Sequence, residues 1–157
     1  MTTPRHATSI FCDDVRQELG NKLSFMGVYR ERLIVPRFPA LLPRFFVVVT
    51  AVTPATRPFE ALTFRLLKGD EVIAETEMEE ALLSATREAA LEETPADEER
   101  VISATAILSL SPFHADAPCR LRARVITEAE ELKAGSLEVV GRETEGAAAA
   151  DGVGGEA

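Results

Sequence analysis

Apolar and polar side chains alternate along most of the chain with the period of two that is typical of β-strands. The alternation is clearest over residues 102–110 and 120–125. Residues 45–52 are instead apolar on both faces and rich in Val, which is typical of a central strand covered on both sides. The pattern predicts eight or nine short strands, over residues 9–16, 22–29, 32–35, 45–52, 62–67, 72–76, 102–110, 120–125 and 137–139.

One segment departs from this alternation. Residues 78–93 are rich in Ala, Leu and Glu, which are strong helix formers, and Pro95 follows them. We expect either one short helix at about 80–92 or a mobile loop, and the sequence leaves both readings open across residues 78–99. Many short strands with at most one helix predict an all-β fold, a two-sheet antiparallel sandwich that is immunoglobulin-like in outline. A partly open β-barrel is the alternative.

The first two predicted strands are joined by Leu19-Gly20-Asn21, which we interpret as a three-residue hairpin loop because Gly and Asn tolerate positive φ. The facing pairs are then Glu18 with Lys22, Val15 with Phe25, Asp13 with Gly27, and Phe11 with Tyr29. Asp13 would share a face with Phe11 and point toward the core. A carboxylate there would need backbone N–H groups or an arginine as partners.

The composition is that of a globular protein of one domain's size. The 157 residues are 46% hydrophobic and 27% charged. We assign residues 1–141 to a single β-sandwich domain and the acidic, Ala/Gly-rich residues 142–157 to a disordered tail. Neither a secretory signal nor a membrane-spanning stretch is evident, so we expect a cytoplasmic protein without membrane contacts. Cys12 and Cys119 would then be free thiols.

The charge balance bears on the choice of partner. The formal net charge is −9, which argues against nucleic acid because binding to its backbone needs a cationic surface. Twelve acids lie between Asp70 and Glu99, forming either a solvated face or a docking surface for a basic partner. One basic stripe stands out, with Arg120, Arg122 and Arg124 on a single strand face. These arginines form either an anion-docking face or ion pairs with acids on neighbouring strands.

We recognise no catalytic, nucleotide-binding or metal-binding motif, and we therefore predict no catalytic residue, no cofactor and no metal ligand. Asp13 and Asp14 are adjacent on a strand, so they point to opposite faces and cannot act on one atom without a bulge. The candidates that remain for a structural or binding motif are Asp13, Asp14, Arg16 and Gly27.

The run Phe11-Cys12-Asp13-Asp14-Val15-Arg16-Gln17-Glu18, followed by residues 20–29 (GNKLSFMGVY), resembles the opening of an uncharacterised bacterial family of short β-sandwich-like proteins. Members of that family open with a C-D-D-x-R-x-E strand, an N-G-K-like turn and a strand that ends G-V-Y. The likeness continues through the proline-punctuated residues 34–43, although the turn here has Gly20-Asn21 in place of Asn-Gly. The resemblance implies a β-sandwich and adds no catalytic residue.

We therefore expect a non-catalytic interaction or structural module that acts through sheet faces, edges or loops. Its partner would be an unidentified protein or further copies of the same chain. The alternative is a small-ligand binder or enzyme with a site near Asp13, Asp14 and Arg16.

Overall fold

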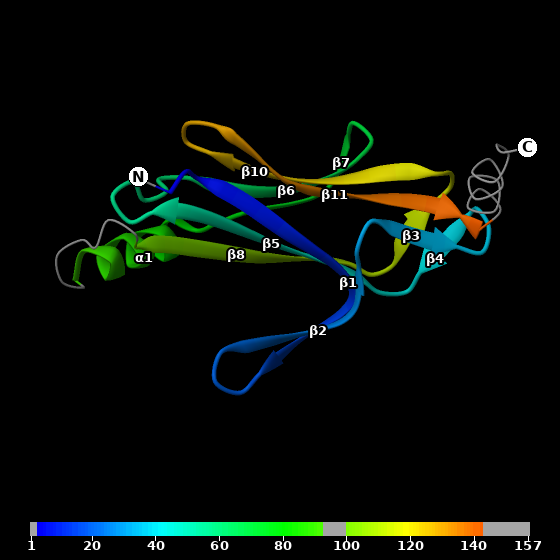
Figure 1. The fold of residues 1–157 in the computed structure, drawn as a ribbon, viewed down its shortest axis with the longest axis horizontal. Coiled ribbons are helices and arrows are strands. Elements are labelled where there is room, and N and C mark those ends of the chain that lie inside the picture. The colour runs from blue at the N-terminus through cyan, green and yellow to red at the C-terminus, as the bar shows by residue number, and fades with distance from the viewer. Residues whose placement is uncertain (1–2, 93–99, 143–157) are drawn as a thin grey trace, which may run out of the picture.

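The computed structural model describes residues 3–92 and 100–142, which form two large stacked sheets (Figure 1). The first sheet has the strand order β2 (Lys22–Tyr29), β1 (His6–Glu18), β5 (Phe45–Pro54) and β8 (Val101–Leu110). The second has the order β3 (Arg32–Val35), β11 (Glu131–Gly141), β10 (Cys119–Thr127), β6 (Leu62–Lys68) and β7 (Glu71–Glu77). A small sheet pairs β4 (Ala40–Leu42) with β9 (Phe113–Ala115), and α1 (Glu80–Glu92) connects β7 to β8.

The predicted all-β sandwich is confirmed, and the described strands form no closed barrel. The pairing is not wholly antiparallel, however, because β3 lies parallel to β11. After β2 the chain crosses to the other layer within two residues, so that crossing, and no hairpin, sets the direction of β3. The pattern predicted neither β4 nor β9, each of which has only three residues.

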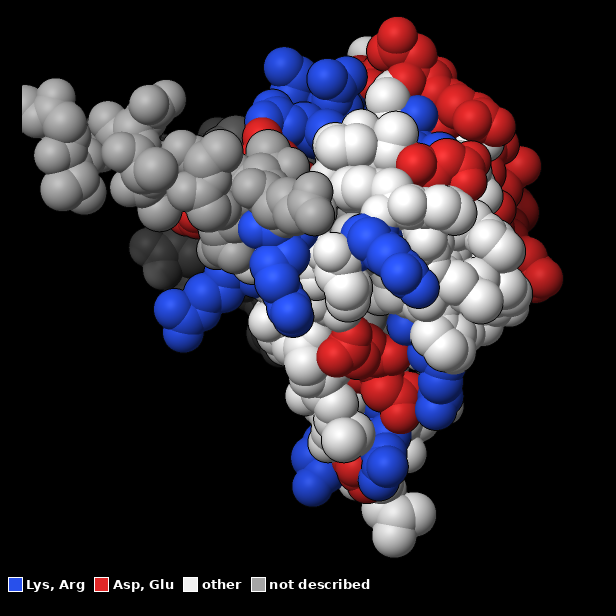
Figure 2. All heavy atoms as spheres, turned by 90° about the vertical axis from the view of Figure 1, so that its right-hand side faces the viewer, with Lys and Arg blue, Asp and Glu red and all other residues white. Residues whose placement is uncertain are grey.

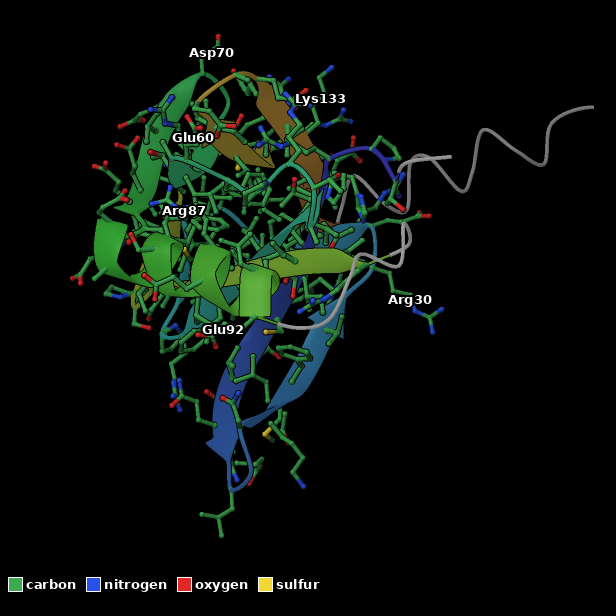
Figure 3. All side chains as sticks on the ribbon, turned by 90° about the vertical axis from the view of Figure 1, so that its left-hand side faces the viewer. Arg30, Glu60, Asp70, Arg87, Glu92 and Lys133 are labelled. Carbon is green, nitrogen blue, oxygen red and sulfur yellow. The ribbon has the colours of Figure 1, made fainter. Side chains whose placement is uncertain are left out.

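The segment that could be helix or loop is a helix over Glu80–Glu92, while residues 93–99 lie outside the described part of the chain. Leu83 is buried on this helix. Other side chains of α1 face β8, where Ala85 and Ala89 line a shallow surface pocket together with Ile102. Figure 3 shows α1, with Arg87 and Glu92 labelled, lying across the β8 side of the first sheet. The tail predicted over residues 142–157 is described only at its first residue.

The core lies between the two sheets and takes one face from each. Its largest fully buried side chains come from β3, β5, β6, β10 and β11 and include Leu33, Phe45, Phe64, Leu121 and Leu137. Each such side chain contributes about 1.5–3 kcal/mol by leaving water. β5 is buried along nearly its whole length, as its mostly apolar sequence predicts.

A buried arginine fixes the start of β1, and the sequence pattern gives no indication of it. The Arg5 side chain is 1% exposed and forms an ion pair of 2.6 Å with Glu128 in the β10–β11 connection. Its guanidinium also donates to the Thr53 hydroxyl and to the carbonyl of Pro58, and it lies 4.8 Å from the centre of the Phe59 ring. Arg5 thus links the N-terminal segment to both sheets.

The β1–β2 hairpin extends past the end of the sandwich, away from both layers (Figure 1). The second sheet covers the first half of β1, where Ser9 donates to the carbonyl of Ala134 on β11 at 2.7 Å. Beyond that overlap, no described strand of the second sheet pairs with the hairpin or continues under it. This projecting element holds four of the residues selected from the sequence, Asp13, Asp14, Arg16 and Gly27.

Candidate functional site: the β1–β2 hairpin

The hairpin has the predicted register. Glu18 faces Lys22, Val15 faces Phe25, and Phe11 faces Tyr29. Gly20 and Asn21 both have positive φ, of 81° and 57°, and so supply the left-handed position that a three-residue loop needs. Gly20 and Asn21 therefore determine which side chains of β1 and β2 lie opposite one another.

The base of the hairpin is anchored by a cluster of aromatic rings. Phe45 lies at its centre, with ring centroids 6.3 Å from Phe11, 6.0 Å from Tyr29 and 5.1 Å from Phe113. Phe11, Phe45 and Phe113 are buried and Tyr29 is half-buried. Aromatic pairs at these separations stabilise beyond the area that they bury. The hairpin therefore leaves the sandwich from a rigid aromatic base.

Asp13 lies one step beyond this base and is exposed, so the prediction that it points into the core was wrong. Its face was predicted correctly, because it accepts a hydrogen bond from the hydroxyl of Tyr29 on the same side as Phe11. The alternation identified the face, but the layer that would have buried Asp13 ends before the hairpin does. No arginine pairs with Asp13 among the described residues.

Gly27 makes room for the Asp13 carboxylate. Gly27 has φ +66°, and a Cβ there would lie 2.7 Å from the carboxylate carbon of Asp13 and closer still to its oxygen Oδ2. Any other residue at position 27 would displace Asp13 and adopt a backbone conformation that costs an L-residue about 1–2 kcal/mol. Asp13, Gly27 and Tyr29 thus form one unit, which we call the hairpin pin.

Asp14 lies on the opposite face, so the two aspartates do not converge. Asp14 Oδ1 accepts from the Arg44 guanidinium and from the backbone N–H of Val15, each at 2.9 Å. Arg44 in turn lies 5.6 Å from the centre of the Phe46 ring. Arg16 is exposed farther along β1, near the hairpin tip. The four candidate residues therefore share one hairpin but do not line one pocket.

Two groups beside Asp13, the Tyr29 hydroxyl and the Cys12 thiol, have raised pKa values. Burial, then the hydrogen bond to Asp13 and its negative charge, raise the pKa of the Tyr29 hydroxyl. Burial, followed by the charge of Asp13, raises the pKa of the Cys12 thiol. Cys12 is fully buried, and a protonated, inaccessible thiol is a poor nucleophile.

The hairpin carries exposed apolar side chains along its whole length, from Val28 at the base to Leu19 in the loop. Leu19 in the loop is 94% exposed, Val28 is 52% exposed and Met26 is 45% exposed, and Leu23 is also exposed. Figure 2 shows the hairpin as a narrow projection with a white tip, above which blue and red side chains lie among white ones. A monomeric protein seldom exposes so many large apolar side chains on one element unless that element binds something.

The other edges of the two large sheets are protected. β7 carries three glutamates among its seven residues, β3 is only four residues long, and α1 lies along β8. β2 is eight residues long, is paired only with β1, and has Lys22 as its single charged residue. Charges, short length and helical cover are the usual means of preventing pairing at a sheet edge. Among the described edge strands of these sheets, β2 alone is long, has no helix over it and carries a single charge, Lys22 at its end.

An apolar groove begins where the hairpin ends. Its volume is about 460 Å³, and it is lined by Tyr29, Leu33, Val35, Pro39 and Leu41 together with their neighbours on β3 and β4. Tyr29 is therefore shared between the hairpin pin and the groove. The groove contains none of the four candidate residues from the sequence.

The basic stripe on β10 is largely engaged in ion pairs. Arg120 pairs with Glu138, and Arg124 lies 3.5 Å from Glu131, both of them acids on the neighbouring strand β11. Arg122 is half-buried between them. For two of the three arginines the arrangement follows the ion-pair reading, and anion docking stays a prediction.

Taken together, the fold and this site define a small β-sandwich domain with one unprotected, projecting hairpin. Residues 7–140 match a family of unknown function (DUF6941), and the chain belongs to that family. The finer resemblance, to a bacterial family through its motif, stays a prediction. Neither the curated proteins nor the solved structures gave a match.

Residues 3–92 and 100–142 hold no group of three or more His, Cys, Asp or Glu side chains placed to bind a metal ion. The one helix in the same ranges is too short and too polar to span a membrane.

Proposed function

We propose that this protein is a non-catalytic binding module whose contact element is the β1–β2 hairpin. Its edge strand β2 pairs with an extended strand of another polypeptide and adds that strand to the first sheet. In this mode the main-chain hydrogen bonds supply affinity, and alternate side chains supply specificity. The observation that carries the proposal is the unprotected edge of β2, beside three protected edges.

The hairpin pin supports this role. An edge strand that recruits a partner must hold its free N–H and C=O groups in an extended line before the partner arrives, because ordering them on binding costs affinity. The aromatic base and the bond between Tyr29 and Asp13 hold β2 against β1 at the point where the sandwich stops supporting it. Lys22 is the only charge that a partner strand would meet along β2.

Site-specific photocrosslinking in cells that naturally produce the protein tests the proposal. A photoreactive residue at Val28 should crosslink to an extended segment of one identified polypeptide, and Met26→Lys should abolish that product. Val72 on β7 is the matched control, because it is 44% exposed on an edge strand that carries charges. Equal crosslinking from both positions, or none from Val28, would contradict the proposal.

A further inference from the structure

We infer that the strand that pairs with β2 is the β2 strand of a second copy of this chain. The two strands would run antiparallel about a two-fold axis and join two four-stranded sheets into one continuous sheet. This inference rests on the proposed function, since it names the partner of the same edge.

The side-chain pattern of β2 suits pairing with itself. Directly opposite residues of an antiparallel pair point to the same face, and the faces alternate along each strand. The two-fold axis must therefore lie between one residue of β2 and the same residue of the second copy. With the axis at Ser24, Phe25 or Met26, the residues of β2 that meet are all uncharged except Lys22. Lys22 would lie opposite Met26, opposite Val28 or beyond the paired region. In none of these registers do two lysines face each other.

The charges of the hairpin favour the antiparallel arrangement. The tip carries two cations, Arg16 and Lys22, with the one anion Glu18. The base carries three anions, Asp13, Asp14 and Glu31, with two cations, Arg30 and Arg44, so its net charge is still negative. An antiparallel pair places the tip of each hairpin beside the base of the other, so the net charges that approach are opposite. A parallel pair would bring like ends together and would lack the two-fold symmetry that most homodimers have.

The size of the contact predicts a reversible dimer. Eight residues of strand extend over about 26 Å. A single edge contact of this length buries less than the roughly 800 Å² per partner of a standard stable interface. The dimer should therefore dissociate in the micromolar range rather than persist at nanomolar concentrations.

Sedimentation velocity of the full chain from about 1 μM to about 1 mM measures this equilibrium. We expect a concentration-dependent shift from monomer to dimer. The double variant Met26→Lys/Val28→Lys should weaken the dimer at least about tenfold, because it places four lysines at the contact. Val72→Lys, which changes an equally exposed valine on the other sheet, should leave the equilibrium unchanged. A chain that is monomeric throughout, or a dimer that Met26→Lys/Val28→Lys does not weaken, would overturn the inference.

Single cysteines locate the axis and confirm the element. In Ser24→Cys, Phe25→Cys and Met26→Cys, only the residue on the axis faces its own copy, at a Cβ separation of about 4.5–5.5 Å. One of the three variants should therefore form a disulfide-linked dimer much faster than the other two and faster than the parent protein. Val72→Cys is the control, and rapid linkage through it would overturn the inference.

These results separate the inference from the proposal on which it rests. If the purified chain stays monomeric while the photoreactive residue on β2 crosslinks to a different protein, the second copy is the wrong partner and the binding module stands. If β2 neither dimerises nor crosslinks, both fail.

Discussion

Gly27→Ala tests whether the hairpin pin holds β2 in place. The substitution adds a Cβ that would meet the carboxylate of Asp13, whose carbon lies 2.7 Å away. It also forces alanine into a backbone with φ +66°, at a cost of about 1–2 kcal/mol. Moving Asp13 aside breaks its bond with the Tyr29 hydroxyl, which contributes about 0.5–1.5 kcal/mol. The expected loss is about 2–3 kcal/mol.

This loss should appear locally, because the hairpin can open without unfolding the sandwich. Hydrogen exchange of the β2 amides is therefore the assay. Since about 1.4 kcal/mol corresponds to a factor of ten, protection of β2 should fall roughly 30-fold to 100-fold. Protection of β5 should not change, and the midpoint of global urea unfolding should move little.

Gly69→Ala supplies a matched control. Gly69 has φ +62°, yet a Cβ there would have no neighbour within 4 Å. Its variant bears the backbone cost without the clash, so protection of the β6–β7 hairpin should fall about tenfold. If Gly27→Ala reduces protection of β2 no more than that, the carboxylate of Asp13 moves away freely and the pin does not hold the hairpin. Asp13→Ala combined with Gly27→Ala should lose less than the sum of the two single changes.

Three further results are expected. Burial acts to raise the pKa of Glu128, but the hydrogen bonds from Arg5 and from backbone N–H groups, together with the charge of Arg5, lower this pKa overall. Glu128 therefore stabilises the fold fully above its unfolded pKa of about 4.3, and this stabilisation is lost as the pH falls through its folded pKa. Glu128→Gln should thus lose about 2 kcal/mol at pH 7 in urea unfolding and converge with the parent in strong acid; a constant difference would contradict this. Burial raises the pKa of both cysteine thiols, so at pH 8 both should be alkylated more slowly than a free thiol, and Cys12 should react most slowly. Equal alkylation rates at Cys12 and Cys119 would contradict the burial argument. A chain ending at Gly141 should melt within about a degree of the full chain in calorimetry, and a loss of several degrees would mean that the tail packs on the domain.

Local patterns in the sequence were enough to predict most of the strands and the hairpin register. A strand with one covered face has to repeat every two residues, and a three-residue loop with two residues at positive φ fixes the pairing from Glu18 back to Phe11. The same local signals, the alternation of side chains and the Gly20-Asn21 loop, placed the candidate site on the first hairpin. The exposed apolar side chains of β2 could not be recognised as exposed from the sequence. Met26 and Val28 look like core residues as long as the layer that would cover them is unknown.

The sequence by itself determined which residues form strands, which faces they share and how the first hairpin pairs, since all of these follow from interactions between near neighbours. Only the tertiary structure decided where each face is covered. It leaves Asp13 exposed because the second sheet stops short of the hairpin, and it buries Arg5 because Thr53 and Glu128, far away in sequence, meet there. It also makes β3 parallel to β11. Periodicity records the face of a strand, but burial depends on what lies above that face, and distant parts of the chain supply it.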